Sequence, residues 1–138
     1  MKRYAADLWS RATEALRVAQ SLLGDSSDNA ASRAYYAAFN AVSALFALQE
    51  KTFVKHKEVE VAVHRDLVKP GRWPKERGKD FSRLMNLRAW GDYGGGRHVS
   101  NEEAVESIKL AMQIVEQVHS ENPEAFPLSI STENRPES

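Results

Sequence analysis

An arginine and two adjacent tyrosines stand within the otherwise small and apolar stretch Ser32–Phe46, "SRAYYAAFNAVSALF". Aromatic rings stack on nucleic-acid bases and guanidinium groups bind phosphate, so Arg33 and Tyr36 are candidate contacts for RNA or a nucleotide. In the structural alternative, which we favour for both tyrosines, the rings fill the core while their hydroxyls and Arg33 reach polar partners. A helix that is apolar on most sides is packed by several neighbours. The stretch therefore predicts a central helix whose polar end borders a groove.

Potential metal ligands recur every fourth residue at His56, Glu60 and His64, which brings them near one helix face. A metal site needs converging ligands, whereas the angle drifts along this segment and no fourth ligand is evident. We therefore expect a solvated face and no metal or other cofactor. His56 stands at the start of the third predicted helix, where it can cap that helix or border the groove.

Two loops contain further candidate binding residues. Trp73 lies among basic residues in "KPGRWPK", where an open indole could stack on bases. Downstream, "YGGGRH" places Arg97 and glycine backbone donors just before a helix N-terminus, which is a candidate anion site. This glycine run is neither a Walker nor a Rossmann motif, because the lysine–serine pair and the preceding strand are missing.

Basic residues are concentrated in the middle of the chain, although the formal net charge is zero. Nine lysines and arginines but only four acids lie between Arg65 and Arg97, and eight glutamates follow Asn101. This asymmetry indicates a segment that could meet an anion such as a phosphate backbone or an acidic partner. The alternative is a solvated helix face whose neutralising acids lie beside it in the fold, and the sequence does not favour either.

Length and composition indicate one soluble domain. The chain has 138 residues, of which 42% are hydrophobic and 28% charged, a normal globular balance. No apolar run is long enough to span a bilayer, and the N-terminus lacks the apolar core of a signal peptide, so we expect a cytoplasmic protein without membrane contacts. The absence of cysteine excludes disulfides, thiolate metal sites and cysteine nucleophiles.

Apolar periodicity and turn residues predict five helices. "SNEE" is a capping box for the last one, with Ser100 as N-cap and Glu103 at the third helical position. Alternating valines in the third segment also suggest a strand, but we favour a helix because the other elements are helical. Strand signals are otherwise scarce, which predicts an all-α bundle. The predicted helices are approximately Tyr4–Leu23, Asp28 or Asn29 to Gln49, Lys57–Val68, Lys75–Trp90, and Ser100 to His119.

The order of "SRAYYAAFNAVSALF", "KHKEVEVAVHRDLVKPG", "LRAWGDY" and "VSNEEAVESIKLA" resembles the HEPN domain family, especially its small stand-alone bacterial and archaeal members. The resemblance implies a four- to five-helix up-and-down bundle of HEPN type, usually a homodimer. It assigns residues 1–121 to a single helical domain. Residues 122–138 contain three prolines and no apolar periodicity, so we expect a flexible tail, although Phe126, Leu128 and Ile130 could dock in a groove.

Many proteins of this family are metal-independent ribonucleases in toxin–antitoxin, phage-defence and CRISPR-linked systems. Their motif is an arginine followed after four to six residues by a histidine, because guanidinium stabilises the phosphate charge and imidazole accepts a proton near neutral pH. The resemblance makes Arg88 and His98 the candidate catalytic residues. Nine residues separate them, including three consecutive glycines, so we expect weak or absent cleavage.

Two functions follow as hypotheses. The first is an RNA- or nucleotide-binding component of a toxin–antitoxin or phage-defence module, with doubtful metal-independent ribonuclease activity. The alternative is a non-catalytic dimeric protein that docks a nucleotidyltransferase or another partner, since other proteins of the family do so. In this alternative Arg88 and Asp92, one helical turn apart, form a structural ion pair.

Overall fold

The computed structural model describes residues 2–93 and 95–128, and within them the chain is helical without any strand. The third segment is a helix, as predicted, but its second half widens into a π-helix. No helix in this part of the chain is long and apolar enough to cross a membrane. The all-α fold class is confirmed by the elements α1 (Lys2–Ser21), α2 (Ser27–Leu48), α3 (His56–Ala62), η1 (Val63–Val68), α4 (Lys75–Tyr93) and α5 (Asn101–Glu121).

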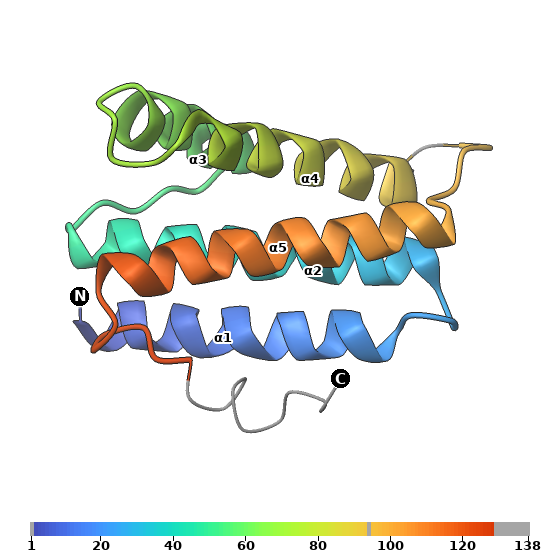
Figure 1. The fold of residues 1–138 in the computed structure, drawn as a ribbon, viewed down its shortest axis with the longest axis horizontal. Coiled ribbons are helices and arrows are strands. Elements are labelled where there is room, and N and C mark those ends of the chain that lie inside the picture. Colours follow the sequence, from blue (N-terminus) through green and yellow to red (C-terminus); the bar gives the residue numbers. More distant parts are fainter. Residues whose placement is uncertain (1, 94, 129–138) are drawn as a thin grey trace.

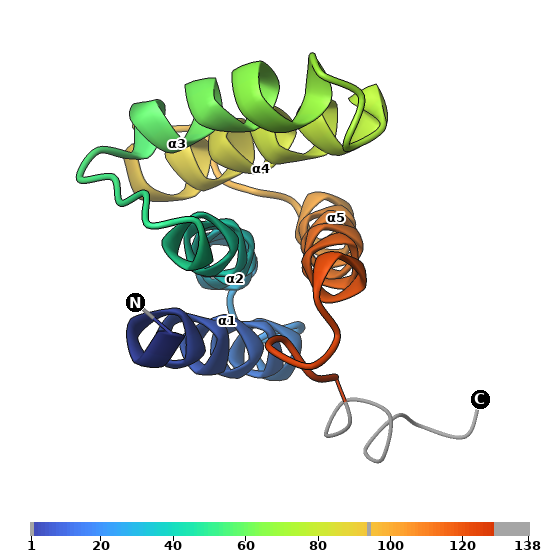
Figure 2. The ribbon, with the colours of Figure 1, turned by 90° about the vertical axis from the view of Figure 1, so that its left-hand side faces the viewer.

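The helices form an up-and-down bundle around α2 (Figure 1). α1 and α4 run in one direction, and α2 and α5 run in the opposite direction (Figure 1). Viewed along the bundle, α1 lies on one side of α2, α3 and α4 lie on the opposite side, and α5 lies beside it (Figure 2). α2 contacts α1, α3, α4 and α5.

Small side chains allow α2 to be surrounded in this way. Alanine lets neighbouring backbones approach closely, while larger residues of the same helix fill the remaining space, such as Val42 and Phe46, both fully buried. The predicted central helix is therefore confirmed. Eight alanines of α2 are buried: Ala30, Ala31, Ala34, Ala37, Ala38, Ala41, Ala44 and Ala47.

Helix capping agrees with the prediction from the sequence at α5 and differs from it at α2. Ser100 and Glu103 form the predicted capping box of α5, with both reciprocal hydrogen bonds at 3.0 Å. At α2 the prediction of Asp28 or Asn29 as N-cap is wrong: Ser26 is the cap, and its Oγ accepts from the Asn29 backbone at 3.2 Å. Asp28 lies in the first helical turn, where its carboxylate is available for a partner from another loop.

The interpretation of Trp73 as an open loop residue is wrong. The turn before it depends on Gly71, whose φ of +88° favours glycine. Trp73 is 2% exposed, and its indole nitrogen donates to a carboxylate oxygen of Glu121 at 3.2 Å. Arg72 pairs with the other oxygen of that carboxylate at 2.6 Å. The loop is thus fastened to the end of α5, and the indole has no open face for a base.

The prediction of a flexible tail from residue 122 is also wrong for residues 122–128. Phe126 is fully buried, and its ring centroid lies 5.2 Å from that of Trp9 on α1. The Trp9 indole donates to the Pro127 carbonyl at 2.9 Å, and Nδ1 of His119 lies 2.6 Å from the Phe126 carbonyl oxygen. Prolines prevent a helix here, but they do not prevent packing. Ile130 lies outside the described residues.

Replacing Phe126 with alanine should destabilise the fold by about 3–5 kcal/mol, the usual cost of emptying a buried aromatic site. Denaturant unfolding of the full chain measures this loss. Val54→Ala is the matched control, because Val54 is 92% exposed and its truncation should leave stability nearly unchanged. Equal stability of Phe126→Ala and wild type would show that the segment after α5 is not part of the core.

Candidate functional site

Two arginines converge on one tyrosine between α2 and α4. The guanidinium carbons of Arg33 and Arg88 lie 4.8 Å and 5.4 Å from the centroid of the Tyr36 ring. Arg88 also donates to the Tyr36 hydroxyl at 2.9 Å. Such cation–π contacts are favourable because the ring face is negative. We call Arg33, Tyr35, Tyr36, His56 and Arg88 the Tyr36 cluster.

A buried tyrosine joins His56 to this cluster. Tyr35 is fully buried, and its hydroxyl lies 2.8 Å from Nδ1 of His56 at the start of α3. The His56 ring also packs on Phe39, with centroids 4.5 Å apart, and on Tyr36 at 5.7 Å. Three aromatic side chains from two turns of α2 therefore hold the imidazole, which remains partly exposed.

The surroundings disfavour charge on both polar rings. Partial burial lowers the pKa of His56, and the positive charge of Arg88 lowers it further. Burial raises the pKa of the Tyr35 hydroxyl, against a smaller opposing effect of Arg88. At neutral pH the pair is consequently a neutral imidazole joined to a neutral phenol.

The cluster has more positive than negative charge. Nε of Arg88 lies 2.9 Å from a carboxylate oxygen of Asp92, one turn along α4, as expected from their spacing. The Arg88 side chain is only 15% exposed. Arg33 is partly exposed and has no carboxylate partner among the described residues. Arg88 thus has a carboxylate partner and Arg33 has none among the described residues, so Arg33 is the cation that an external anion can reach.

The basic middle segment is largely neutralised within the fold. Its arginines pair with acids on α4, on α5 or beside them in sequence, so for them the second alternative considered above is confirmed. The ion pairs are Arg65–Asp66, Arg72–Glu121, Arg77–Asp80, Arg83–Glu106, Arg88–Asp92 and Arg97–Glu103.

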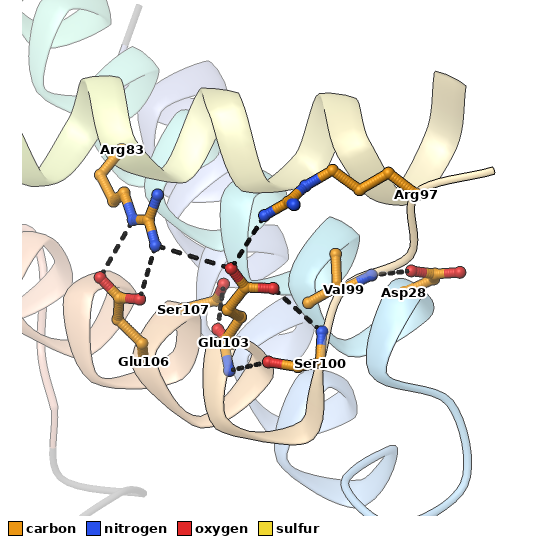
Figure 3. A network of polar contacts seen from close by, with 8 residues as sticks. All are labelled: Asp28, Arg83, Arg97, Val99, Ser100, Glu103, Glu106 and Ser107. Carbon is orange, nitrogen blue, oxygen red and sulfur yellow. Dashed lines mark hydrogen bonds and ion pairs between the residues drawn. The ribbon is translucent and has the colours of Figure 1, made fainter. Parts of the chain in front are cut away.

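Glu103 organises the loop that precedes α5 (Figure 3). Its carboxylate accepts from the Ser100 backbone at 3.0 Å, and one of its oxygens lies 3.2 Å from Arg97 and 3.9 Å from Arg83 (Figure 3). The Arg97 guanidinium also lies 3.8 Å from the centroid of the Trp90 ring. These contacts engage Arg97 within the protomer.

Asp28 holds the other end of the same loop. Its carboxylate accepts from the Val99 backbone at 2.7 Å and lies 2.7 Å from Nδ1 of His98. The Val99 hydrogen bond is the main cause of the lowered pKa of Asp28. Gly91 of α4 packs closely on the backbone of the same residue, since a Cβ there would lie 3.1 Å from the Asp28 carbonyl oxygen.

The two candidate catalytic residues are held at different turns of α2. His98 contacts Asp28, whereas Arg88 contacts Tyr36, which is eight residues further along the helix. Eight residues correspond to about 12 Å of helix rise. The His98 side chain is 74% exposed and has its own acidic partner. These contacts do not support a direct Arg88–His98 pair within the protomer.

His56 does not converge with Glu60 and His64. His56 faces Tyr35, whereas Nε2 of His64 lies 3.0 Å from the Ser82 hydroxyl, which itself donates to Glu60 at 2.6 Å. Within residues 2–93 and 95–128, no group of three or more histidines and acids could hold a metal ion.

Sequence reasoning placed His56 near a groove but did not connect it to Tyr35. The two residues are 21 positions apart, and no motif spacing links them. The available signal was the pair of tyrosines on the predicted central helix, since a buried phenol needs a polar partner. Which residue would supply that partner depended on how α3 crosses α2.

Comparison with known proteins supports a family assignment. The family described as "HEPN domain" matches residues 5–121. A UPF0332 protein from Thermotoga maritima is 37% identical over 112 residues, which cover 80% of this chain and 85% of that relative.

The free energy of unfolding should decrease as the pH falls below the ordinary histidine pKa of about 6.5. In the folded protein, partial burial and then the charge of Arg88 lower the pKa of His56, so the unfolded chain binds more protons in this window and stability rises with pH. His56→Gln, which cannot titrate, should show a weaker dependence in urea unfolding between about pH 8 and about pH 5.

The most alkaline point of this series is the control, because histidine is neutral there in both states and any difference reports packing alone. A pH dependence that is identical in wild type and His56→Gln would contradict the assignment.

Proposed function

The chain belongs to the HEPN domain family, and we propose that it binds RNA or a nucleotide through phosphate at the Tyr36 cluster. We place it in a toxin–antitoxin or phage-defence module, the setting that its family suggests. Family membership alone leaves the ligand open, because one fold supports many functions. The choice of ligand rests on the chemistry of the cluster.

Arg33 is the observation that supports this function. Six arginines of the middle segment have carboxylate partners, whereas Arg33 has only the Tyr36 ring among the described residues. A guanidinium on an aromatic ring keeps donors for the two oxygens of a phosphate. Arg88 adds positive charge behind it, 5.4 Å from the same ring.

Binding without efficient cleavage fits the contacts best. Metal-independent cleavage needs an imidazole that can accept the 2′-hydroxyl proton beside a cation that faces the phosphate. His98 is engaged by Asp28, two turns of α2 away from the partner of Arg88. We therefore propose that any ribonuclease activity is weak.

A second candidate function is a dimeric protein that docks a nucleotidyltransferase or another protein. The observation that favours it is the internal engagement of Arg88, which pairs with Asp92 and Tyr36 and is only 15% exposed. In that case the Tyr36 cluster supports the fold, and the outer helix faces make the contacts.

Arg33→Ala should weaken binding of a short single-stranded RNA by about tenfold or more, because hydrogen bonds to charged groups contribute about 1.5–3 kcal/mol. Affinity should also fall steeply with added salt, since phosphate neutralisation releases counterions. Fluorescence anisotropy of end-labelled RNA in a buffer with chelator measures both effects. Arg3→Ala is the matched control, because Arg3 is exposed on α1 and also lacks a carboxylate partner among the described residues.

The same reactions should leave the RNA uncut. Undetectable or salt-insensitive binding would contradict the proposed function and favour the docking alternative. Robust cleavage in chelator that disappears in His98→Ala would instead show that the protein is an active ribonuclease.

We also expect a homodimer, as is usual in the family. Tyr4 of α1 is 48% exposed and borders a hollow of about 50 Å³ whose lining includes the partly buried Phe39 and Phe53. A stable interface would bury about 1,200–2,000 Å² in total. Sedimentation velocity at micromolar concentration should give the mass of two chains, and Tyr4→Asp should shift the population toward one. Only monomer in the wild-type protein would refute this expectation.

A further inference from the structure

We propose that His56 contacts the phosphate: its Nε2–H donates a hydrogen bond to the group that Arg33 holds, and Tyr35 selects the tautomer that makes this possible. This inference rests on the proposed function and names the chemistry that the site recognises. The recognised group is a phosphate of a nucleic acid or nucleotide, bound without regard to the base.

The tautomer follows from the burial of Tyr35. Its hydroxyl is fully buried, and a buried hydroxyl proton needs an acceptor. Within the described part of the chain, its hydrogen-bond partner is Nδ1 of His56 at 2.8 Å. If Nδ1 accepts this bond in the neutral ring, the remaining proton must lie on Nε2.

The position of the imidazole follows from its aromatic neighbours. The ring lies 4.5 Å from Phe39 and 5.7 Å from Tyr36 between centroids, so it cannot rotate without losing the Tyr35 bond. Tyr36 is also the ring beneath the Arg33 guanidinium at 4.8 Å. Arg33 and His56 therefore adjoin the same tyrosine, and both are partly exposed. In the proposed complex, one phosphate beside the Tyr36 ring accepts hydrogen bonds from both side chains.

The cluster is not suited to stacking on a base. Both Arg33 and Arg88 lie over the Tyr36 ring, and Tyr35 is fully buried. Phe39 has the His56 ring against it at 4.5 Å. The aromatic rings thus already contact the two guanidiniums and the imidazole. The donors of the cluster recognise phosphate oxygens, which every nucleotide shares.

The same tautomer makes His56 a donor and not a general base. Partial burial and the charge of Arg88 keep the ring neutral, and Tyr35 occupies the lone pair of Nδ1. Nε2 then has a proton and no free lone pair to accept the proton of a 2′-hydroxyl. His56 can therefore stand near a phosphate without cleaving the adjacent bond, in agreement with the proposed binding function.

Substitutions that mimic one ring nitrogen at a time test the proposal. The amide nitrogen of glutamine can approach the place of Nε2, whereas asparagine extends only as far as Nδ1. His56→Asn should weaken binding of end-labelled oligouridylate by about tenfold, the effect of one charge-assisted hydrogen bond, and His56→Gln should restore most of that affinity. Oligoadenylate and oligouridylate should bind wild type alike. Inorganic phosphate should compete with both.

Nitrogen-15 NMR of the full chain supplies a readout that a purely structural role would not move. Long-range proton–nitrogen spectra should show His56 with its proton on Nε2, and Tyr35→Phe should weaken this preference. Addition of RNA should shift the Nε2 resonance and raise the pKa of His56, because a nearby anion favours the protonated ring.

The possible failures can be told apart. If wild type binds RNA, Arg33→Ala does not and His56→Asn does, the role of His56 is overturned while the proposed function stands. A His56 proton on Nδ1 in the free protein, or a strong preference between the two oligonucleotides, also overturns the role of His56. Absence of RNA binding in wild type overturns the proposed function itself. Melting curves of each variant exclude loss of fold as the cause.

Discussion

The close packing of α2 against its neighbours is the constraint on which the rest of this structure depends. Eight buried alanines let other helices approach its backbone, so its polar side chains must find partners on those helices or on their loops. Asp28 therefore meets the loop before α5, Tyr35 meets the start of α3, and Tyr36 meets α4. A larger residue in place of one of these alanines would push the neighbouring helix away from α2.

The packing of the helices also decides which charged side chains meet. α4 carries most of the middle cations, and α5 carries many of the glutamates, and the bundle places these two helices side by side (Figure 2). Arg83, Arg97 and Glu103 thereby become parts of one network, and the arginines of the basic segment are paired with acids. Arg33 lies on α2 and makes no ion pair with a glutamate of α5 among the described residues, and its guanidinium lies over the Tyr36 ring.

The fold and the site give different kinds of information about function. The family follows from the match of residues 5–121 to the HEPN domain, and the similarity to a UPF0332 protein accompanies it. The short arginine–histidine spacing expected of a ribonuclease motif is absent. Instead, the charge of Arg88 affects the pKa of His56, which lies at the start of α3 and packs on the Tyr36 ring. An imidazole whose Nδ1 accepts from a buried phenol has its proton on Nε2, and this favours the proposed role of His56 as a donor over that of a base.

The sequence alone determined the helices, because apolar periodicity, caps and breakers act over a few residues. It predicted the Ser100–Glu103 capping box, the Arg88–Asp92 pair, the central position of α2 and the all-α class. Only the tertiary structure decided contacts between distant segments. Tyr35 and His56 are 21 residues apart, Trp73 and Glu121 are 48 apart, and Trp9 and Pro127 are 118 apart. Such pairs depend on how helices cross and how loops return, and no local pattern encodes these. For this reason the burial of Trp73 and Phe126 and the contact between His56 and Tyr35 emerged only from the fold.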